Sequence, residues 1–306
     1  MLALLCGGQG ALSSNTFDLV AGQPAAEPVF TAAVRHLGQD PRDLVRTRGA
    51  DELSINHVSQ ILTVTAALAV SACVTDLLGK PIVVAGYSVG EMAAWSLAGI
   101  WTAEEALRLT DVRARLMESA AAQPGRLGYI RGLDRDALHR LLEKHCCEIA
   151  ITNPGNLVVI GGAEQDVTDL CHEAAAQRTA RSGLLAVKIA SHTARLERAC
   201  EPFRQALEAS RRLPIASQHI LLAGGDGERI FSAYAAMAKL ARQVARPIDW
   251  SVTLQAVAEL GVSKMLDLGP GHALADMMQG FHPSIRCYSA DGFRTMDGLR
   301  NWIASD

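Results

Sequence analysis

The chain has 306 residues, of which 49% are hydrophobic and 20% charged, and its formal net charge is -3. This length and composition can bury one large core, or one large and one small domain, and the charge balance excludes the basic surface of a nucleic-acid-binding protein. No apolar run approaches the length of a membrane span. Seven cysteines, an odd number at irregular spacing, predict a reduced, cytoplasmic protein without a metal site.

The first predicted elements form a strand, turn and helix around a serine. Residues 1–5 are predicted to be a buried strand, and 58–78 a long apolar helical segment. The strand 82–85 then leads into Gly86-Tyr87-Ser88-Val89-Gly90, and a helix-like stretch follows. This context is typical of a nucleophile elbow, in which the serine hydroxyl stands above the sheet and the next amide faces an oxyanion. The alternative is an ordinary glycine- and serine-rich turn in an α/β protein.

The middle of the chain differs from its two flanks in its predicted elements. Thr102 and Glu105 form a predicted capping box for a helix to about residue 120. Short elements then alternate, namely strands 127–131, 148–152, 156–160 and 183–189 with helices 134–145 and 163–179. Their order, βαββαβ, is the pattern of a ferredoxin-like unit. We therefore expect a large α/β-hydrolase-like domain with a parallel sheet (residues 1–125 and 190–306) and an inserted ferredoxin-like small subdomain (residues 126–189).

A nucleophilic serine needs a base, and two of the nine histidines are good candidates because each follows a predicted strand. His192 comes after 187–191, and His272 comes after Gly269-Pro270-Gly271. A Ser, acid, His order would combine Ser88 and His272 with one of three aspartates, Asp226, Asp249 or Asp267. The other arrangement is a Ser88–His192 pair without an acid in the usual place. The residues themselves leave both open.

Arg113 differs from the other arginines of its predicted helix. Arg108 and Arg115 each have acidic residues three or four positions away, as expected of exposed ion pairs. The helical neighbours of Arg113 are Leu109, Thr110, Leu116 and Met117, so this guanidinium is predicted to project from the buried stripe. A buried, unpaired guanidinium is costly, so its anion comes either from a distant acid or from a bound substrate.

Four separated motifs resemble the malonyl-CoA:acyl carrier protein transacylase family over nearly the whole chain. They are Gly8-Gln9-Gly10, the elbow Gly86–Glu91, the helical Arg113, and Ser191-His192. The resemblance implies Ser88 as nucleophile and His192 as base, with Gln9 and Val89 in the oxyanion hole. It also implies that Arg113 binds the malonate carboxylate and that the carbonyl of Gln243 orients His192. His272 is then structural.

The elbow sequence most resembles the epsilon subunit of bacterial malonate decarboxylase. The resemblance implies transfer of malonyl from malonyl-CoA to the thiol of an acyl carrier protein. That carrier would bear a phosphopantetheine-type prosthetic group, and other malonate decarboxylase subunits would be further partners. No cofactor or metal is expected. Tyr87 replaces the family's usual histidine and Gly8 a common proline, which affects carrier preference rather than chemistry.

Other functions remain open at this point. A malonyl transacylase of fatty-acid or polyketide synthesis would use the same residues, and methylmalonyl is a second possible acyl group. A serine thioesterase or esterase would favour the Ser88–His272 arrangement and release a free acid. A non-catalytic carrier-binding module would not need Ser88. A nucleotide-binding fold is disfavoured because Ser13 replaces the third glycine of the fingerprint.

Overall fold

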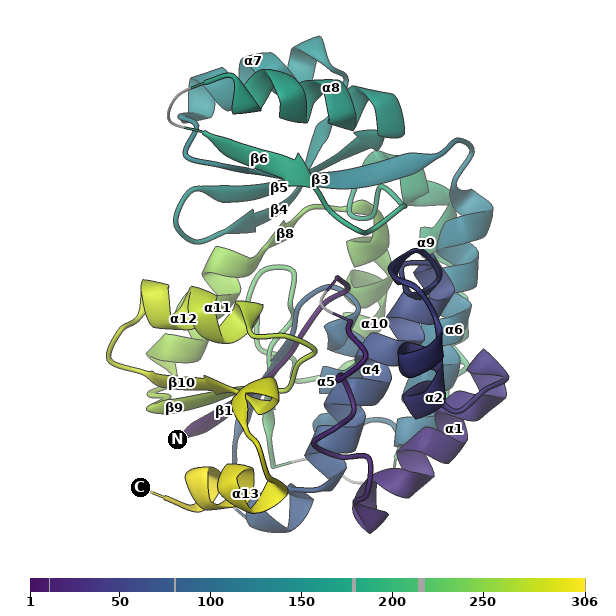
Figure 1. The fold of residues 1–306 in the computed structure, drawn as a ribbon, viewed down its shortest axis with the longest axis vertical. Helices are drawn as coiled ribbons and strands as arrows, with labels where there is room; N and C mark the ends of the chain where they lie inside the picture. The colour runs from purple at the N-terminus through teal and green to yellow at the C-terminus, as the bar shows by residue number, and fades with distance from the viewer. Residues whose placement is uncertain (11, 80, 178–179, 214–217, 306) are drawn as a thin grey trace.

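Two five-stranded sheets organise the computed structural model, which describes residues 1–306 except 11, 80, 178–179, 214–217 and 306 (Figure 1). The strands of the first sheet all run parallel, in the order β10-β9-β1-β2-β7. They are Leu2–Cys6 (β1), Val83–Gly86 (β2), Ile220–Leu221 (β7), Lys264–Asp267 (β9) and Arg286–Ser289 (β10). The predicted parallel sheet of a large α/β domain is confirmed.

Helices surround this sheet, which explains why its neighbouring inner strands β1 and β2 are apolar along their whole length. In β1, Ala3, Leu4 and Leu5 are fully buried, as are Val83 and Val84 in β2. The helices of this domain are Glu27–Leu37 (α1), Pro41–Thr47 (α2), Ala50–Leu53 (α3), Asn56–Ala72 (α4), Gly90–Leu97 (α5), Ala103–Ala120 (α6), Glu197–Glu208 (α9), Ala233–Arg242 (α10), Trp250–Glu259 (α11), Ala273–Phe281 (α12) and Met296–Ala304 (α13).

The second sheet has the order β6-β3-β5-β4-β8 and is antiparallel except where β8 joins β4. Its elements are Gly125–Arg131 (β3), Arg135–Lys144 (α7), Glu148–Asn153 (β4), Leu157–Ala163 (β5), Glu164–Ala175 (α8), Arg181–Leu184 (β6) and Ile248–Asp249 (β8). The predicted βαββαβ order is confirmed. Figure 1 shows α7 and α8 on the outer face of this sheet, and the residues between them form a separate small core.

Three details of the second sheet differ from the prediction. The last strand is Arg181–Leu184 rather than 183–189, although Leu185 and Val187 still form backbone hydrogen bonds with Leu127 of β3. The helix α8 ends at Ala175 rather than 179, and positions 178–179 lie outside the described residues. The sheet also gains β8, which lies beyond the predicted subdomain range and pairs Ile248 with Ile151. Two-residue strands carry too little periodicity to be predicted.

The helix that carries Arg113 begins as predicted but forms one different ion pair. The hydroxyl of Thr102 accepts a hydrogen bond from the Glu105 amide at 3.1 Å. The Glu105 carboxylate accepts hydrogen bonds from the Arg108 guanidinium and from the amide of Arg211. It does not accept one from the Thr102 amide, as the second half of a capping box would. Arg108 pairs with Glu105, three positions before it, while Glu104 pairs with Arg35. Arg115 pairs with Asp111 as expected. The helix 58–78 is shorter than predicted, since α4 ends at Ala72.

The described part of the chain contains no helix that is both long and apolar enough to cross a membrane. Its histidine, cysteine and acidic side chains form no group of three that could hold a metal ion. All seven cysteines are free thiols.

Candidate active site

The turn between β2 and α5 has the geometry of a nucleophile elbow. Ser88 has a φ of +55°, a left-handed conformation that non-glycine residues rarely adopt. Two glycines permit this turn because neighbouring backbone approaches them closely. A Cβ on Gly86 would lie 2.2 Å from the amide nitrogen of Glu91, and one on Gly90 would lie 2.2 Å from the carbonyl oxygen of Cys6. The two glycines therefore allow a tight turn between β2 and α5, with Ser88 at its tip.

The partner of Ser88 is His192, which lies 104 positions further along the chain. The Ser88 Oγ is 2.7 Å from His192 Nε2. The Nδ1 of the same ring is 2.6 Å from the carbonyl oxygen of Gln243, at the start of the 3-10 turn Gln243–Ala245. A carbonyl can only accept, so Nδ1 carries the ring hydrogen and Nε2 is free to accept the serine proton. A backbone carbonyl thus takes the place that an aspartate has in a Ser-His-Asp triad.

The backbone of His192 is as constrained as that of Ser88. Its φ is +63°, its amide donates to the carbonyl of Val244 at 2.8 Å, and its side chain is fully buried. Burial, reinforced by the positive charge of Arg113, lowers the pKa of His192 to about 3. The imidazole is therefore neutral at physiological pH, which is the state that a general base needs.

Arg113 lies in the interior, as its helical neighbours predicted. Its side chain is 1% exposed, and its Nη1 donates to the Oε1 of Gln60 on α4 at 2.6 Å. Its Nη2 is buried without a hydrogen-bond partner among the described residues. Burial lowers the pKa of Arg113 to about 10, and the charge of Glu91 opposes that shift. One edge of a permanently charged fork is therefore unoccupied beside His192, which suits a carboxylate ligand.

Glu91 is a buried carboxylate at the base of the elbow helix. It is 2% exposed and accepts hydrogen bonds from the Gly224 amide at 3.0 Å, from the Trp95 indole at 3.3 Å and from the side-chain amide of Gln243. Burial raises the pKa of Glu91 to about 7, against the effect of these donors. Gln243 therefore links Glu91 to the base: its side-chain amide donates to Glu91, and its backbone carbonyl accepts from His192.

We expect the Glu91→Gln variant to lose a pH inflection that the wild type shows near pH 7. Glu91 is ionised above that pH, and hydrogen bonds to an ionised acceptor are stronger than those to a neutral one by about 1 kcal/mol, or about fivefold. Acyl transfer should therefore fall about fivefold as the pH drops through 7 in the wild type. His192 contributes no inflection there, since its pKa is about 3. Rates measured between pH 5.5 and 8.5 test this, and an unchanged profile in the variant would contradict it.

The loop after β1 brings Gln9 towards the elbow. The register of β1 on β2 pairs Cys6 with Gly86, and the Tyr87 amide donates to the Cys6 carbonyl at 2.9 Å. A Cβ on Gly8 would lie 2.8 Å from the Tyr87 ring. The side-chain nitrogen of Gln9 is buried and lacks a hydrogen-bond partner within the described ranges. Val89 is the fully buried N-cap of α5. The oxyanion-hole role of Gln9 and Val89 stays a prediction.

The alternative base, His272, lies in a different environment. Its side chain is 75% exposed, and its Nδ1 pairs with Asp276 at 2.6 Å. The three candidate acids are also engaged: Asp267 accepts backbone amides, Asp226 pairs with Lys239, and Asp249 caps α11. The structure brings Ser88 to His192 and does not assemble the arrangement with His272.

Residues 42–233, more than half of the sequence, match the acyl transferase domain family. The chain belongs to this family. It is 26% identical to the malonyl CoA-acyl carrier protein transacylase of Haemophilus influenzae, over 98% of each chain. It is 28% identical to the enzyme of that name from Mycobacterium tuberculosis, over 90% of this chain and 91% of the other.

Solved structures of acyl transferases have the same fold. A malonyl-transacylase in complex with a type II PKS acyl-carrier protein superposes with a TM-score of 0.88, at 26% identity over 98% of this chain and 99% of the other. The crystal structure of MCAT from Mycobacterium tuberculosis also gives 0.88, at 26% identity over 98% and 100%. The likeness spans both sheets, so it includes the large domain and the ferredoxin-like subdomain.

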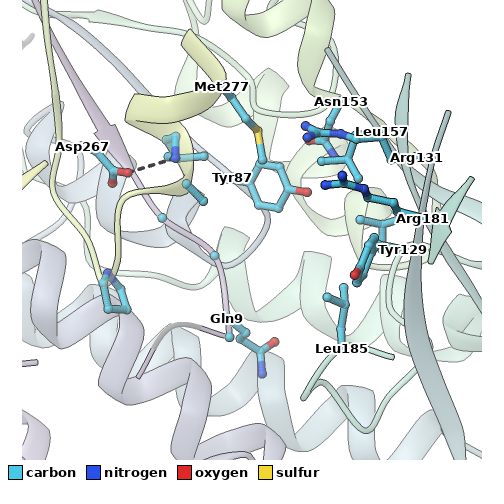
Figure 2. A pocket seen from close by; sticks show the side chains of 17 residues that line it. Gln9, Tyr87, Tyr129, Arg131, Asn153, Leu157, Arg181, Leu185, Asp267 and Met277 are labelled. Atoms are coloured by element: carbon cyan, nitrogen blue, oxygen red, sulfur yellow. Dashed lines mark hydrogen bonds between the residues drawn. The ribbon is translucent and has the colours of Figure 1, made fainter. Parts of the chain in front are cut away.

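The acyl transferase has a cavity of about 530 Å³ next to the elbow (Figure 2). Gln9, Tyr87 and Met277 line it from the large domain. On the other side it is lined from the second sheet by Tyr129, Arg131, Asn153, Leu157 and Arg181, and by Leu185 directly after β6. Figure 2 shows these two groups of side chains facing each other across the opening. Ser88, His192 and Arg113 are not among the residues that line this cavity, whereas Tyr87, the neighbour of Ser88, and Gln9 are, so the cavity lies beside the nucleophile.

Sequence reasoning missed three residues of this acyl transferase site. Gln60, the partner of Arg113, is a fully buried amide that also donates to Asn56 at 2.7 Å. A polar pair four positions apart in an apolar helix was the signal that could have revealed it. Glu91 was noted only as part of the elbow motif. Gly224 had no signal of its own, although a Cβ there would lie 2.0 Å from the carbonyl oxygen of Gly86.

Proposed function

We propose that this protein transfers malonyl from malonyl-CoA to the thiol of an acyl carrier protein, through an acyl-enzyme formed on Ser88. The observation that carries the proposal is the 2.7 Å Ser88–His192 contact beside a buried arginine whose Nη2 has no described partner. The names of the relatives support the same reaction, since the proteins from Haemophilus influenzae and Mycobacterium tuberculosis are both malonyl CoA-acyl carrier protein transacylases.

The first half of the reaction acylates the serine. The Nε2 of His192 accepts the hydroxyl proton as the Ser88 Oγ attacks the thioester carbonyl. The amides of Gln9 and Val89 stabilise the oxyanion of the tetrahedral intermediate. The C–S bond then breaks, and the CoA thiolate takes the proton from His192. The hydrogen bond from Nδ1 to the Gln243 carbonyl keeps the ring in the tautomer that these transfers need.

The second half repeats these steps in the opposite direction. The carrier thiol gives its proton to His192 and attacks the ester carbonyl, and Ser88 leaves with that proton. One thioester replaces another, so the reaction is close to energetically neutral, and the site has to exclude water rather than drive the equilibrium. The full burial of His192 is consistent with this need.

The acyl group is selected by its free carboxylate in this proposal. Arg113 would bind it through the Nη2 that has no described partner, with Gln60 holding the other nitrogen. The carrier is less defined. We expect a phosphopantetheine-type thiol as acceptor, and the similarity of the elbow to the malonate decarboxylase epsilon subunit makes the carrier and other subunits of that enzyme candidate partners. We expect no resident cofactor.

The mass of the intact protein after brief incubation with malonyl-CoA or acetyl-CoA tests the proposal. We expect a malonyl-sized adduct on the peptide that contains Ser88, little acetyl adduct, and loss of the adduct when a carrier thiol is added. Free malonate accumulating without a persistent adduct would instead support a serine thioesterase. If no adduct forms and no turnover occurs, the proposal is contradicted and a binding role is favoured.

A further inference from the structure

The segment that carries His192 is packed against the small subdomain, although Ser88 belongs to the large domain. Thr193, the next residue, is fully buried, and its hydroxyl donates to the Ala190 carbonyl at 2.7 Å. A Cβ on Gly161 of β5 would lie only 2.8 Å from the Cγ2 of Thr193, so the backbone of β5 lies close against this methyl group. The neighbour of the catalytic base therefore contacts the second sheet.

A second contact comes from the adjacent position of the same sheet. Glu148 begins β4, and the register of the sheet pairs it with Gly161 of β5. The Glu148 carboxylate accepts a hydrogen bond from the Ala194 amide at 3.0 Å. Two neighbouring positions of the second sheet thus hold two consecutive residues, Thr193 and Ala194, directly after the base.

The turn that orients the His192 ring is joined to this sheet as well. The carbonyl of Val244, within the turn Gln243–Ala245, accepts the His192 amide at 2.8 Å. The strand β8 follows this turn, and Ile248 of β8 pairs with Ile151 of β4. Figure 1 shows β8 on the side of the second sheet nearest to the large domain. Both segments that fix the base are therefore attached to the second sheet.

We propose that Thr193 and Glu148 are positioning residues, through which the small subdomain sets the place of His192 opposite Ser88. The inference rests on the Ser88–His192 dyad of the proposed function, and neither residue takes part in the chemistry itself. Thr193 can transmit a displacement because its side chain has little freedom. It is β-branched, and turning Cγ2 away from Gly161 would break the hydroxyl bond to the Ala190 carbonyl. A push on the methyl group therefore moves the backbone next to His192.

Gly161→Ala tests this hold by placing a methyl group against Thr193. We expect acylation of Ser88 by malonyl-CoA to slow about 10- to 100-fold with KM little changed, because a misplacement of about 1 Å costs about 100-fold. Labelling of Ser88 by a fluorophosphonate, which needs neither CoA nor a carboxylate, should slow by the same factor. Thr193→Ser removes the methyl group and keeps the hydroxyl. The double variant Gly161→Ala/Thr193→Ser should therefore label within about threefold of Thr193→Ser alone.

Gly162→Ala is the matched control, because it adds a methyl group at the next position of β5. Its Cβ would lie 2.9 Å from the Cys147 Sγ, within the small core on the opposite face of the sheet from Thr193. We expect Gly162→Ala to lower the Tm and to change the labelling rate by less than about threefold. Thr193→Ser should bring no recovery in that background.

Glu148 provides a second test that leaves the core intact, since this residue is exposed. Glu148→Ala should slow labelling about three- to tenfold through loss of the bond to Ala194, and Glu148→Gln, which keeps an oxygen acceptor, should recover most of the rate. If Gly161→Ala does not fold, an unimpaired Glu148→Ala overturns the proposal in its place.

Three other results would also overturn the positioning role. They are a wild-type labelling rate in Gly161→Ala, a loss that Thr193→Ser does not restore, and an equal loss in Gly162→Ala. A wild-type enzyme that the fluorophosphonate labels on Ser88 but malonyl-CoA does not acylate would overturn the proposed function alone. The two failures are therefore distinguishable.

Discussion

Replacing His192 with asparagine should slow malonyl transfer by at least about 10³-fold at pH 7.5. Asparagine tolerates the left-handed φ of +63° better than alanine and cannot act as a base at this pH. The Ser88 hydroxyl would then keep its proton, because no other described side chain hydrogen-bonds to it. Formation of the malonyl adduct under rapid-quench conditions measures the effect on acylation alone.

The coupling between the two residues provides a sharper test. A nucleophile and its base act as a unit, so the double variant Ser88→Ala/His192→Asn should be no slower than the slower single variant. Circular dichroism and thermal unfolding of each variant check that the fold is intact. Multiplicative losses in the double variant would contradict a Ser88–His192 dyad, and wild-type acylation in His192→Asn would point to a different base.

Removing the Arg113 guanidinium should change which acyl group the enzyme accepts. A buried arginine left without its anion costs about 2–5 kcal/mol, which corresponds to a preference for malonyl over acetyl of about 30-fold to several thousand-fold. In Arg113→Ala, acylation by malonyl-CoA should fall by about that factor, whereas acylation by acetyl-CoA should be unchanged or faster. The ratio of kcat/KM for the two donors is the measurement.

A second arginine of the same helix is the control for this change. Arg108 pairs with Glu105 on the partly exposed side of α6, away from the Gln60 contact. Arg108→Ala should leave the malonyl-to-acetyl ratio unchanged. An equal loss for both donors in Arg113→Ala would mean that this residue supports the fold or the position of His192 rather than the substrate carboxylate.

The sequence by itself determined the features whose causes are local. Gly86 and Gly90 around Ser88, between an apolar run and a helix, predicted the elbow, and the glycines are required by backbone contacts within a few ångströms. The alternation of short elements predicted the βαββαβ unit. The neighbours of Arg113 at three and four positions predicted its burial, because helical periodicity fixes which face a side chain occupies.

Only the tertiary structure decided which distant groups meet. The residues alone left both His192 and His272 open as the base, and the resemblance favoured His192. The contact itself depends on chain segments 104 positions apart. The group that orients His192 is the main-chain carbonyl of Gln243. Because every residue has such a carbonyl, side-chain types alone do not reveal which one has this role. Likewise, the Gln60 contact to Arg113 and the close approach of Gly161 to Thr193 join separate elements. Periodicity reports the face of one element, whereas these contacts depend on how two elements are placed against each other.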